Sequence, residues 1–357
     1  MRIGIFHTTL PEPGRKPGGV EVYVERLARR LAGRGHRVKV FSFTAAPADA
    51  PYEHVKLRPS LMARSRAARL LVAPILLNRL DTADLDVLHL HGDDWFLLRR
   101  RLPTVRTFHG SSLYESRTAT SLKRRLSQAL VYPLELLASR LATRSYAVAP
   151  GMPRLYRLHG MLHCGVDSSN GSLGRSETPS VLFVGTWEGR KRGRLLAELF
   201  EREVRPRVPD AELWLVADRG EPAAGVQVIR APSDAELAEL FERAWVFCLP
   251  SEYEGFGIPY IEAMSHGAAV VATANPGARY VLEEGRSGMT VTDGELAGAL
   301  VEVLTDEALR RRLVEEGARR AREFSWDSSL ASHEAAYEAA IAAWRAGRGR
   351  AARRFRR

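Results

Sequence analysis

Residues 246–264 read VFCLPSEYEGFGIPYIEAM, and this stretch decides the fold of the chain. Val246–Leu249 is a short apolar run of the kind that forms a buried strand. A glycine-rich turn follows, in which the backbone can approach a ligand closely, and Pro259 suits the first position of a helix. The stretch therefore predicts a strand, a loop and a helix, with Glu254 on the loop and Glu262 in the first turn of the helix.

The two carboxylates indicate the kind of ligand that this loop would bind. Backbone N–H groups at the start of a helix favour anions, and carboxylates accept hydrogen bonds from hydroxyl groups. Together they suit a ligand that carries both hydroxyls and phosphates, such as a sugar nucleotide. The alternatives are that Glu254 is a solvated loop acid and that Glu262 only stabilises the helix dipole.

Working outward, strand-like apolar runs alternate with helical segments along the chain, which is typical of βαβ units with parallel strands. The last third is helical over Glu295–Glu323 and again over Trp326–Trp344. In doubly wound sheets the ligand lies at the carboxyl ends of the strands, and with two such domains the cleft between them is the expected site. The predicted strands are Ile3–Phe6, Val38–Phe41, Val87–Leu90, Thr104–Phe108 and Ser145–Ala149, then Val181–Val184, Leu213–Val216, Val226–Ile229, Val246–Leu249 and Ala269–Ala272.

The polar stretch 168–178 is the clearest shift in composition and predicts a linker between two domains. We expect a first Rossmann-like domain over 1–167 and a second over 179–325. A C-terminal helix over 326–346 and a basic tail over 347–357 complete the chain.

Composition narrows the function classes. The chain has 357 residues, a net charge of +11 and a pI of about 10.0. Dispersed surface charge, attraction to anionic substrates or membranes, and nucleic-acid binding are the three interpretations. No zinc-finger, helix-turn-helix or RNA-binding motif supports the last, so we expect no nucleic-acid partner. Cys164 and Cys248 form no disulfide framework, and the N-terminus shows no signal peptide. We therefore expect a cytoplasmic protein.

Two basic segments bear on membrane contact. The predicted helix Leu61–Leu80 places arginines among leucines, and the tail ends in Arg353-Arg354-Phe355-Arg356-Arg357. Either could touch anionic lipid at the inner face of a membrane, and a solvated basic face is at least as good an interpretation.

Several motifs in sequence order resemble one family, the retaining GT-B glycosyltransferases of family 4. Gly18-Gly19-Val20-Glu21-Val22 looks like the family's first loop and helix. His89, His91 and the segment Thr107-Phe108-His109-Gly110 look like its histidine-bearing strand ends. Gly185 followed by Arg190-Lys191 resembles its glycine-then-lysine segment, and 247–267 matches its Glu-x7-Glu region.

The resemblance implies a fold and a reaction. The fold is α/β, with two doubly wound domains facing across a cleft and the last helix returning to the first domain. The reaction is transfer of a sugar from a UDP- or GDP-sugar to an acceptor hydroxyl or amine, with retention of configuration. A lipid-linked acceptor, a glycan and a natural product all stay open as acceptors.

The resemblance also implies roles for individual residues. Catalysis falls to Glu254, His109 and Lys191. Glu262 would bind the ribose hydroxyls, and Lys191 with Arg190 would neutralise the diphosphate, which the loop at Gly18 and Gly19 would also contact. Glu254 would hold the hydroxyls of the transferred sugar together with the loop residues Gly255, Phe256, Gly257 and Ile258, and His109 would lie beside that sugar.

Each role has a plainer alternative: a hydrogen-bonded strand-end histidine for His109, an exposed basic cluster for Arg190-Lys191-Arg192, and a simple turn for Gly18-Gly19. The sequence departs from the family pattern at three positions. Thr186 replaces a diphosphate-binding arginine, Cys164 replaces an asparagine, and Tyr280 replaces a glutamate.

No Asp-x-Asp pair of the kind that binds a divalent ion is present, so we expect no metal and no cofactor. Retention could follow from a carboxylate nucleophile or from acceptor entry on the leaving-group face. We favour the second route, because the family places Glu254 at the hydroxyl end of the sugar. The competing functions are a sugar-nucleotide epimerase of related fold and a sugar-nucleotide-binding subunit without catalysis.

Overall fold

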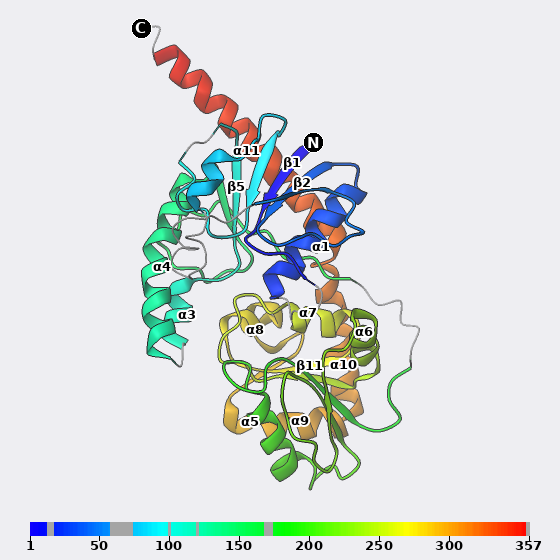
Figure 1. Ribbon diagram of the computed structural model, residues 1–357. Helices are drawn as coiled ribbons and strands as arrows, with labels where there is room; N and C mark the ends of the chain where they lie inside the picture. The colour runs from blue at the N-terminus through cyan, green and yellow to red at the C-terminus, as the bar shows by residue number, and fades with distance from the viewer. Residues whose placement is uncertain (13–17, 58–73, 99–100, 119–120, 168–173, 355–357) are drawn as a thin grey trace. The chain divides into compact units, whose positions relative to one another are not determined.

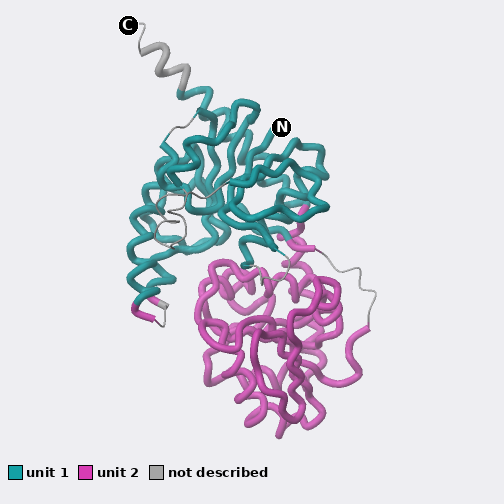
Figure 2. Tube along the Cα trace, viewed as in Figure 1, with its two compact units in different colours: residues 1–116, 123–165, 327–357 teal, residues 117–122, 166–326 magenta. Residues whose placement is uncertain are grey.

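The computed structural model describes residues 1–12, 18–57, 74–98, 101–118, 121–167 and 174–354. The chain divides into two compact units, shown in two colours in Figure 2. Unit 1 comprises residues 1–116, 123–165 and 327–357, and unit 2 comprises residues 117–122 and 166–326. Each unit contains one six-stranded sheet with flanking helices (Figure 1).

The sheet of unit 1 is parallel and has the order β3-β2-β1-β4-β5-β6. The chain reverses its direction of progress across the sheet between β1 and β4, which is the point where ligands bind in doubly wound folds. The edge strand β3 is not predicted from the sequence, because its half-exposed residues carry no apolar run. The strands are β1 (Arg2–Phe6), β2 (Arg37–Ser42), β3 (Glu53–Lys56), β4 (Val87–Leu90), β5 (Thr104–Phe108) and β6 (Arg144–Ala147).

Helices complete unit 1: α1 (Gly19–Gly33), α3 (Ser112–Thr118), α4 (Leu122–Leu141), the short turn η2 (Leu77–Arg79) and α11 (Trp326–Arg354). Although α11 ends the chain, it belongs to unit 1, where Ser329 Oγ donates to the carbonyl of His163 at 2.8 Å. The predicted helix Leu61–Leu80 lies mostly outside the described residues, as do positions 168–173 of the predicted linker.

Unit 2 repeats the arrangement with the order β12-β11-β10-β7-β8-β9, again parallel throughout. Its chain reversal lies between β7 and β10. Every residue of β10 and β11 is buried, as their unbroken apolar sequences predict. The strands are β7 (Ser180–Val184), β8 (Glu212–Val216), β9 (Val226–Ile229), β10 (Val246–Leu249), β11 (Ala269–Thr273) and β12 (Met289–Val291).

The helical elements of unit 2 are α5 (Gly193–Leu199), η3 (Phe200–Val204), α6 (Asp234–Arg243), α7 (Ile258–Ser265), α8 (Pro276–Val281), η4 (Glu283–Gly285), η5 (Asp293–Glu295), α9 (Leu296–Thr305) and α10 (Glu307–Arg322). The segment Glu295–Glu323 is helical as predicted, but it is divided at Asp306. The carboxylate of Asp306 accepts from the N–H of Leu309 at 2.9 Å and so starts α10 anew.

The predicted α/β fold with two doubly wound parallel sheets is confirmed. Within the described residues, no helix is both long enough and apolar enough to cross a bilayer.

Candidate functional site

The candidate residues of unit 2 gather at the carboxyl ends of β7, β10 and β11, where the order of the sheet reverses. β10 lies between the other two strands, so the loops that follow all three meet at one edge of the sheet. The loop after β7 carries Arg190 and Lys191, and the loop after β10 carries Glu254. This edge is where a doubly wound sheet binds its ligand.

Glu254 is held in place by two side chains. Its carboxylate accepts from Ser251 Oγ at 2.8 Å and lies 2.7 Å from Nη1 of Arg190. The residue is only 7% exposed, although it lies on a loop. A solvated loop acid would be far more exposed, so this geometry disfavours that alternative. The carboxylate is fixed in orientation, which is what recognition of sugar hydroxyls requires.

A buried network fixes the loop that carries Glu254. Asn275 Nδ2 donates to the carbonyl of Ser251 at 3.1 Å, and Thr273 Oγ1 donates to the same carbonyl at 2.9 Å. The N–H of Gly277 donates to the carbonyl of Glu254 at 3.0 Å. A Cβ atom at Gly277 would lie 2.8 Å from that carbonyl oxygen, so only glycine permits this contact. The loop after β11 therefore supports the loop after β10.

The start of α7 depends on Gly257, which caps the helix with φ +95°. A Cβ atom here would lie 2.4 Å from the ring of Tyr260, so the position excludes every other residue on two grounds. The first N–H groups of a helix have no acceptor within the helix. The N–H of Ile258 is one of these groups. It lies on the same segment as Glu254, as do the N–H groups of Gly255, Phe256 and Gly257 just before the helix, and all four can serve as donors to a ligand.

Glu262 lies elsewhere than expected. Because α7 begins at Ile258, Glu262 is its fifth residue and falls in the second turn, so the prediction of a first-turn position is wrong. The reason is that Gly257 caps the helix one residue earlier than Pro259 suggested. Glu262 is half-buried, and its distance from the first N–H groups weakens the interpretation that it serves only the helix dipole.

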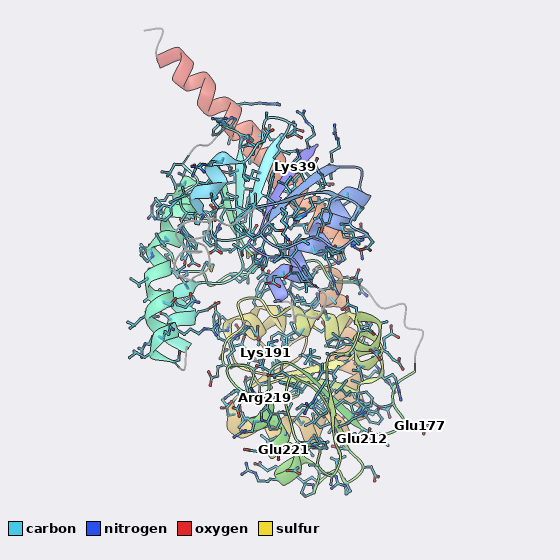
Figure 3. All side chains as sticks on the ribbon, viewed as in Figure 1. Lys39, Glu177, Lys191, Glu212, Arg219 and Glu221 are labelled. Carbon is cyan, nitrogen blue, oxygen red and sulfur yellow. The ribbon has the colours of Figure 1, made fainter. Side chains whose placement is uncertain are left out.

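The three consecutive cations after β7 differ in their contacts. Arg190 binds the carboxylate of Glu254 and donates to the carbonyl of Tyr253 at 2.5 Å. Arg192 has φ +56° and binds Asp293 at 2.7 Å, which fixes its side chain to the rest of unit 2. Lys191, which is labelled in Figure 3, is half-buried and lies in the loop before α5, with its Cδ 3.0 Å from the position of a Cβ at Gly185.

The departures from the family pattern have local explanations. Thr186 Oγ1 donates to the carbonyl of Glu188 at 2.8 Å, which shapes the turn after β7. Tyr280 packs with Phe256 and Phe324, and the guanidinium of Arg320 lies 5.2 Å from its ring. At this position an aromatic cluster supports the loop after β10. Cys164 is buried in unit 1, which raises the pKa of its thiol.

Unit 1 brings histidines together at its own chain reversal. His7 follows β1, His91 follows β4, and His109 follows β5. Nδ1 of His91 lies 2.9 Å from Nε2 of His109, so one hydrogen bond joins the two rings and one ring must donate. Nε2 of His91 is buried and has no hydrogen-bond partner among the described residues. His109 is therefore oriented by a neighbour that is itself buried.

Burial keeps these rings neutral. It lowers the pKa of His109 from the usual 6.5 to about 3, and the charges of His7 and Arg106 add to this effect. The pKa of His91 is lowered well below its usual value, chiefly by burial as well. At neutral pH His109 is thus an uncharged imidazole, able to form a hydrogen bond without repelling positive charge on a sugar ring.

α11 supplies hydrogen-bond partners for Tyr23 of α1 and for His89 of β4. Nδ1 of His333 donates to the carbonyl of Ser329 at 2.7 Å. In the neutral ring its Nε2 therefore accepts, and the hydroxyl of Tyr23 donates to it at 3.0 Å. Tyr337 lies 2.9 Å from Nδ1 of His89 through its hydroxyl. The last helix of the chain thereby fixes residues of β4 and α1.

Gly18 and Gly19 begin α1, where Gly18 is the N-cap residue. The N–H of Gly18 donates to the carboxylate of Glu21 at 3.1 Å. Nothing lies within 4 Å of a Cβ position at Gly19, and the nearest atoms to one at Gly18 are 3.8 Å away. Neither glycine has a positive φ. Local structure does not require glycine here, so the simple-turn alternative leaves both residues unexplained.

Three residues that support Glu254 were not predicted as part of the site: Ser251, Asn275 and Gly277. A signal was present in Asn275-Pro276, because asparagine before proline is a helix N-cap followed by its first residue. That signal predicts the start of α8 directly after β11, where Asn275 indeed accepts from the N–H of Ala278 at 2.9 Å. His333 and Tyr337 carried no such signal, since only folding brings them to β4.

Comparison with known sequences adds independent information. The chain matches the family described as Glycosyltransferase Family 4 over residues 17–169, and that described as Glycosyl transferases group 1 over residues 178–306. It is 31% identical to phosphatidyl-myo-inositol mannosyltransferase of Mycobacterium tuberculosis, over 91% of this chain and 93% of the relative. It is 28% identical to the protein of the same name from Mycolicibacterium smegmatis, over 95% and 94%.

Solved structures agree on the fold. Sucrose-phosphate synthase from Thermosynechococcus elongatus superposes with a TM-score of 0.77 at 19% identity, covering 96% of this chain and 99% of that one. Anabaena HepE in complex with UDP and glucose superposes with a TM-score of 0.68 at 17% identity, covering 95% and 99%. The fold is GT-B. The chain belongs to glycosyltransferase family 4 and is a glycosyltransferase (EC 2.4).

Proposed function

We propose that the protein transfers a sugar from a nucleoside diphosphate to a hydroxyl of a lipid-borne acceptor, with retention of configuration and without a metal ion. The observation that carries the donor side of this proposal is the buried carboxylate of Glu254. It lies at the chain reversal of the unit 2 sheet, next to the N-terminus of α7, and is fixed by Ser251 and Arg190. Carboxylate, helix amides and cations on adjacent loops suit sugar hydroxyls and a diphosphate.

In the proposed complex Glu254 and the amides of 255–258 bind hydroxyls of the sugar, and Glu262 binds the ribose. Arg190 and Lys191 bind the diphosphate, which the loop at Gly18 and Gly19 also contacts. His109 lies beside the sugar as a neutral hydrogen-bonding group. The pairing of Arg190 with Glu254 in the free protein means that donor binding redistributes the hydrogen bonds of both side chains.

The proposed reaction breaks the bond between the anomeric carbon and the phosphate oxygen, and the electron pair leaves with the diphosphate. The acceptor hydroxyl forms its bond to the same face of the sugar and passes its proton to the departing phosphate oxygen. Negative charge thus grows on the diphosphate, where Lys191, Arg190 and the helix amides stabilise it through positions fixed in advance. No carboxylate nucleophile is needed. Trapping a sugar covalently bound to Glu254 would disprove this route.

The names of the relatives support mannose as the sugar and an inositol phospholipid as the first acceptor to test. A screen of nucleotide sugars by thermal shift comes first, because a ligand that binds only the folded state raises the melting temperature. We expect a rise with a UDP- or GDP-sugar; the absence of a rise with any nucleotide sugar contradicts the proposal.

Nucleotide release with and without acceptor separates the proposal from its competitors. A transferase releases nucleotide much faster with acceptor, an epimerase does so without one, and a binding subunit does not turn over. The same assay with a chelator tests metal independence. We expect the rate to stay unchanged, since Arg190 and Lys191 supply the positive charge; loss of activity that magnesium restores would refute this part.

A further inference from the structure

α4, which belongs to unit 1 except for its first residue, exposes large apolar side chains along one side. Leu122 is 70% exposed, Leu126 58%, Leu130 73% and Leu137 38%, and Pro133 is exposed between them. At about 100° per residue these five positions fall within about 80° of the helix circumference and extend over roughly 22 Å. We call them the leucine stripe. α4 lies at the margin of unit 1 in the view of Figure 1.

The leucine stripe points away from the core of unit 1. The buried residues of α4 are Ala138 and Ser139, and their mean direction lies about 170° around the helix from the centre of the stripe. An amphipathic helix normally turns its apolar stripe toward the core. Here the apolar stripe is the outward one, and none of the described residues covers it. An outward apolar stripe of this size marks an interaction surface.

The charges beside the stripe indicate its partner. Lys123, Arg124 and Arg125 are exposed in the first turn of α4, and Arg140 is exposed near its end. The single acid of the helix, Glu135, is turned to the inside. Its carboxylate accepts from the N–H of Ser112 at 3.1 Å, from Oγ of the same residue at 2.6 Å, and from the hydroxyl of Tyr156. The exposed charges of α4 are therefore all positive.

We propose that α4 is the element by which the protein lies on an anionic lipid surface, with the leucine stripe inserted among the lipids. Helices that bind in the plane of a membrane combine an apolar face with lysine and arginine, and bury the apolar side chains at the boundary of headgroups and acyl chains. Cations near the surface are attracted by anionic headgroups. This inference deepens the proposed transfer to a lipid-borne acceptor, but the binding is measured without any transfer.

The test is sedimentation of the full-length protein with vesicles of phosphatidylcholine, with and without phosphatidylglycerol. We expect the protein to sediment with the anionic vesicles and to remain in solution with phosphatidylcholine alone. The double variant Leu126→Gln/Leu130→Gln should bind the anionic vesicles at least about tenfold more weakly than the wild type, since two inserted side chains lose their apolar contact. Its matched control is Leu98→Gln/Leu155→Gln, which changes side chains that are 65% and 60% exposed outside α4 and should bind as the wild type does.

A charge variant tests the attraction of the α4 cations to anionic headgroups. Replacing Lys123, Arg124 and Arg125 by glutamine should weaken binding by about fivefold for each cation removed. Replacing the exposed Arg202, Arg207 and Arg312 of unit 2 by glutamine removes the same net charge elsewhere and should change binding little. All variants should keep the melting temperature of the wild type, because every substituted side chain is exposed.

Three outcomes would overturn the proposal: a wild type that does not sediment, a leucine variant that sediments equally well, or a control variant that loses binding to the same extent. A protein that forms dimers in solution, loses them with the leucine variant and ignores vesicles would show that a second copy covers the stripe. A protein that binds vesicles through α4 but transfers no sugar would leave this inference intact and refute the proposed function.

Discussion

Among single residues, Glu254 combines burial, a fixed orientation and a charge partner on a neighbouring loop. Its contact with Arg190 has a cost for any ligand, since a buried carboxylate that loses a partner must find a replacement. Sugar hydroxyls can supply that replacement, and the diphosphate can take over the guanidinium. In the proposed complex the ion pair is exchanged for ligand contacts, so that no buried charge is left unpaired.

Glu254→Gln should lower kcat/KM by about 100-fold or more, because the amide accepts weaker hydrogen bonds from the sugar and no longer pairs with Arg190. Steady-state kinetics with the donor identified by thermal shift measures this. Glu252→Gln is the matched control: Glu252 is exposed on the same loop, and its variant should retain wild-type activity. Equal loss in both variants would mean that the loop, and not the carboxylate of Glu254, is responsible.

The buried histidines His109 and His333 predict how the free energy of unfolding varies with pH. An unfolded histidine takes a proton near pH 6.5, whereas burial lowers the pKa of His109 to about 3 and that of His333 to about 4. Between these values the unfolded chain binds more protons than the folded one, so stability rises with pH up to about 6.5 and falls on acidification. Urea unfolding across this interval should show that slope. His333→Gln should reduce it, and an unchanged slope would contradict the assignment of His333 as neutral.

Among the secondary-structure elements, the starts of α1 and α7 use glycine for different reasons. Gly257 at α7 has a positive φ and no room for a side chain, whereas Gly19 at α1 has open space around it. The first glycine is required by the fold. For the second we propose close approach of a ligand to the helix N-terminus.

This contrast predicts opposite results for two alanine variants. Gly257→Ala should destabilise the protein by about 1 kcal/mol or more, through strain and contact with Tyr260. Gly19→Ala should leave the melting temperature unchanged and raise the KM for the donor, because the added methyl group keeps the diphosphate from the helix amides. Differential scanning calorimetry on both variants measures the change in stability, and steady-state kinetics with the donor measures the change in KM. An unaltered KM in Gly19→Ala would remove α1 from the donor site.

The sequence predicted the strands of both sheets well because parallel strands buried on both faces are unbroken apolar runs, as Val246–Leu249 shows. It failed for β3 and β12, which are short edge strands, and for the break at Asp306, where a capping acid divides one apolar pattern. Within the candidate site, motif residues such as Glu254 were accessible to prediction. The supporting contacts of Asn275 and His333 were not, because they join residues far apart in sequence.

For the whole molecule, the division into units does not follow the order of the chain. Unit 1 contains both ends of the sequence, and unit 2 is almost entirely the continuous segment 166–326. A chain that ends at Ser325 should therefore keep the unit 2 network around Glu254 and lose the partners of Tyr23 and His89. Calorimetry should show the unfolding transition of unit 2, and the midpoint of that transition should rise when nucleotide is added. Survival of the unit 1 transition would mean that α11 contributes little to it.

The place of α11 also sets an order of events during synthesis on the ribosome. The strands of unit 1 emerge first, but the hydrogen bond of His89 with Tyr337 and that of Tyr23 with His333 form only when α11 has been made. Unit 2, encoded between them, has all its strands available earlier. The half that is translated first is thus the half completed last. Until α11 has been made, we expect unit 1 to be the less stable half and therefore the one that chaperones bind.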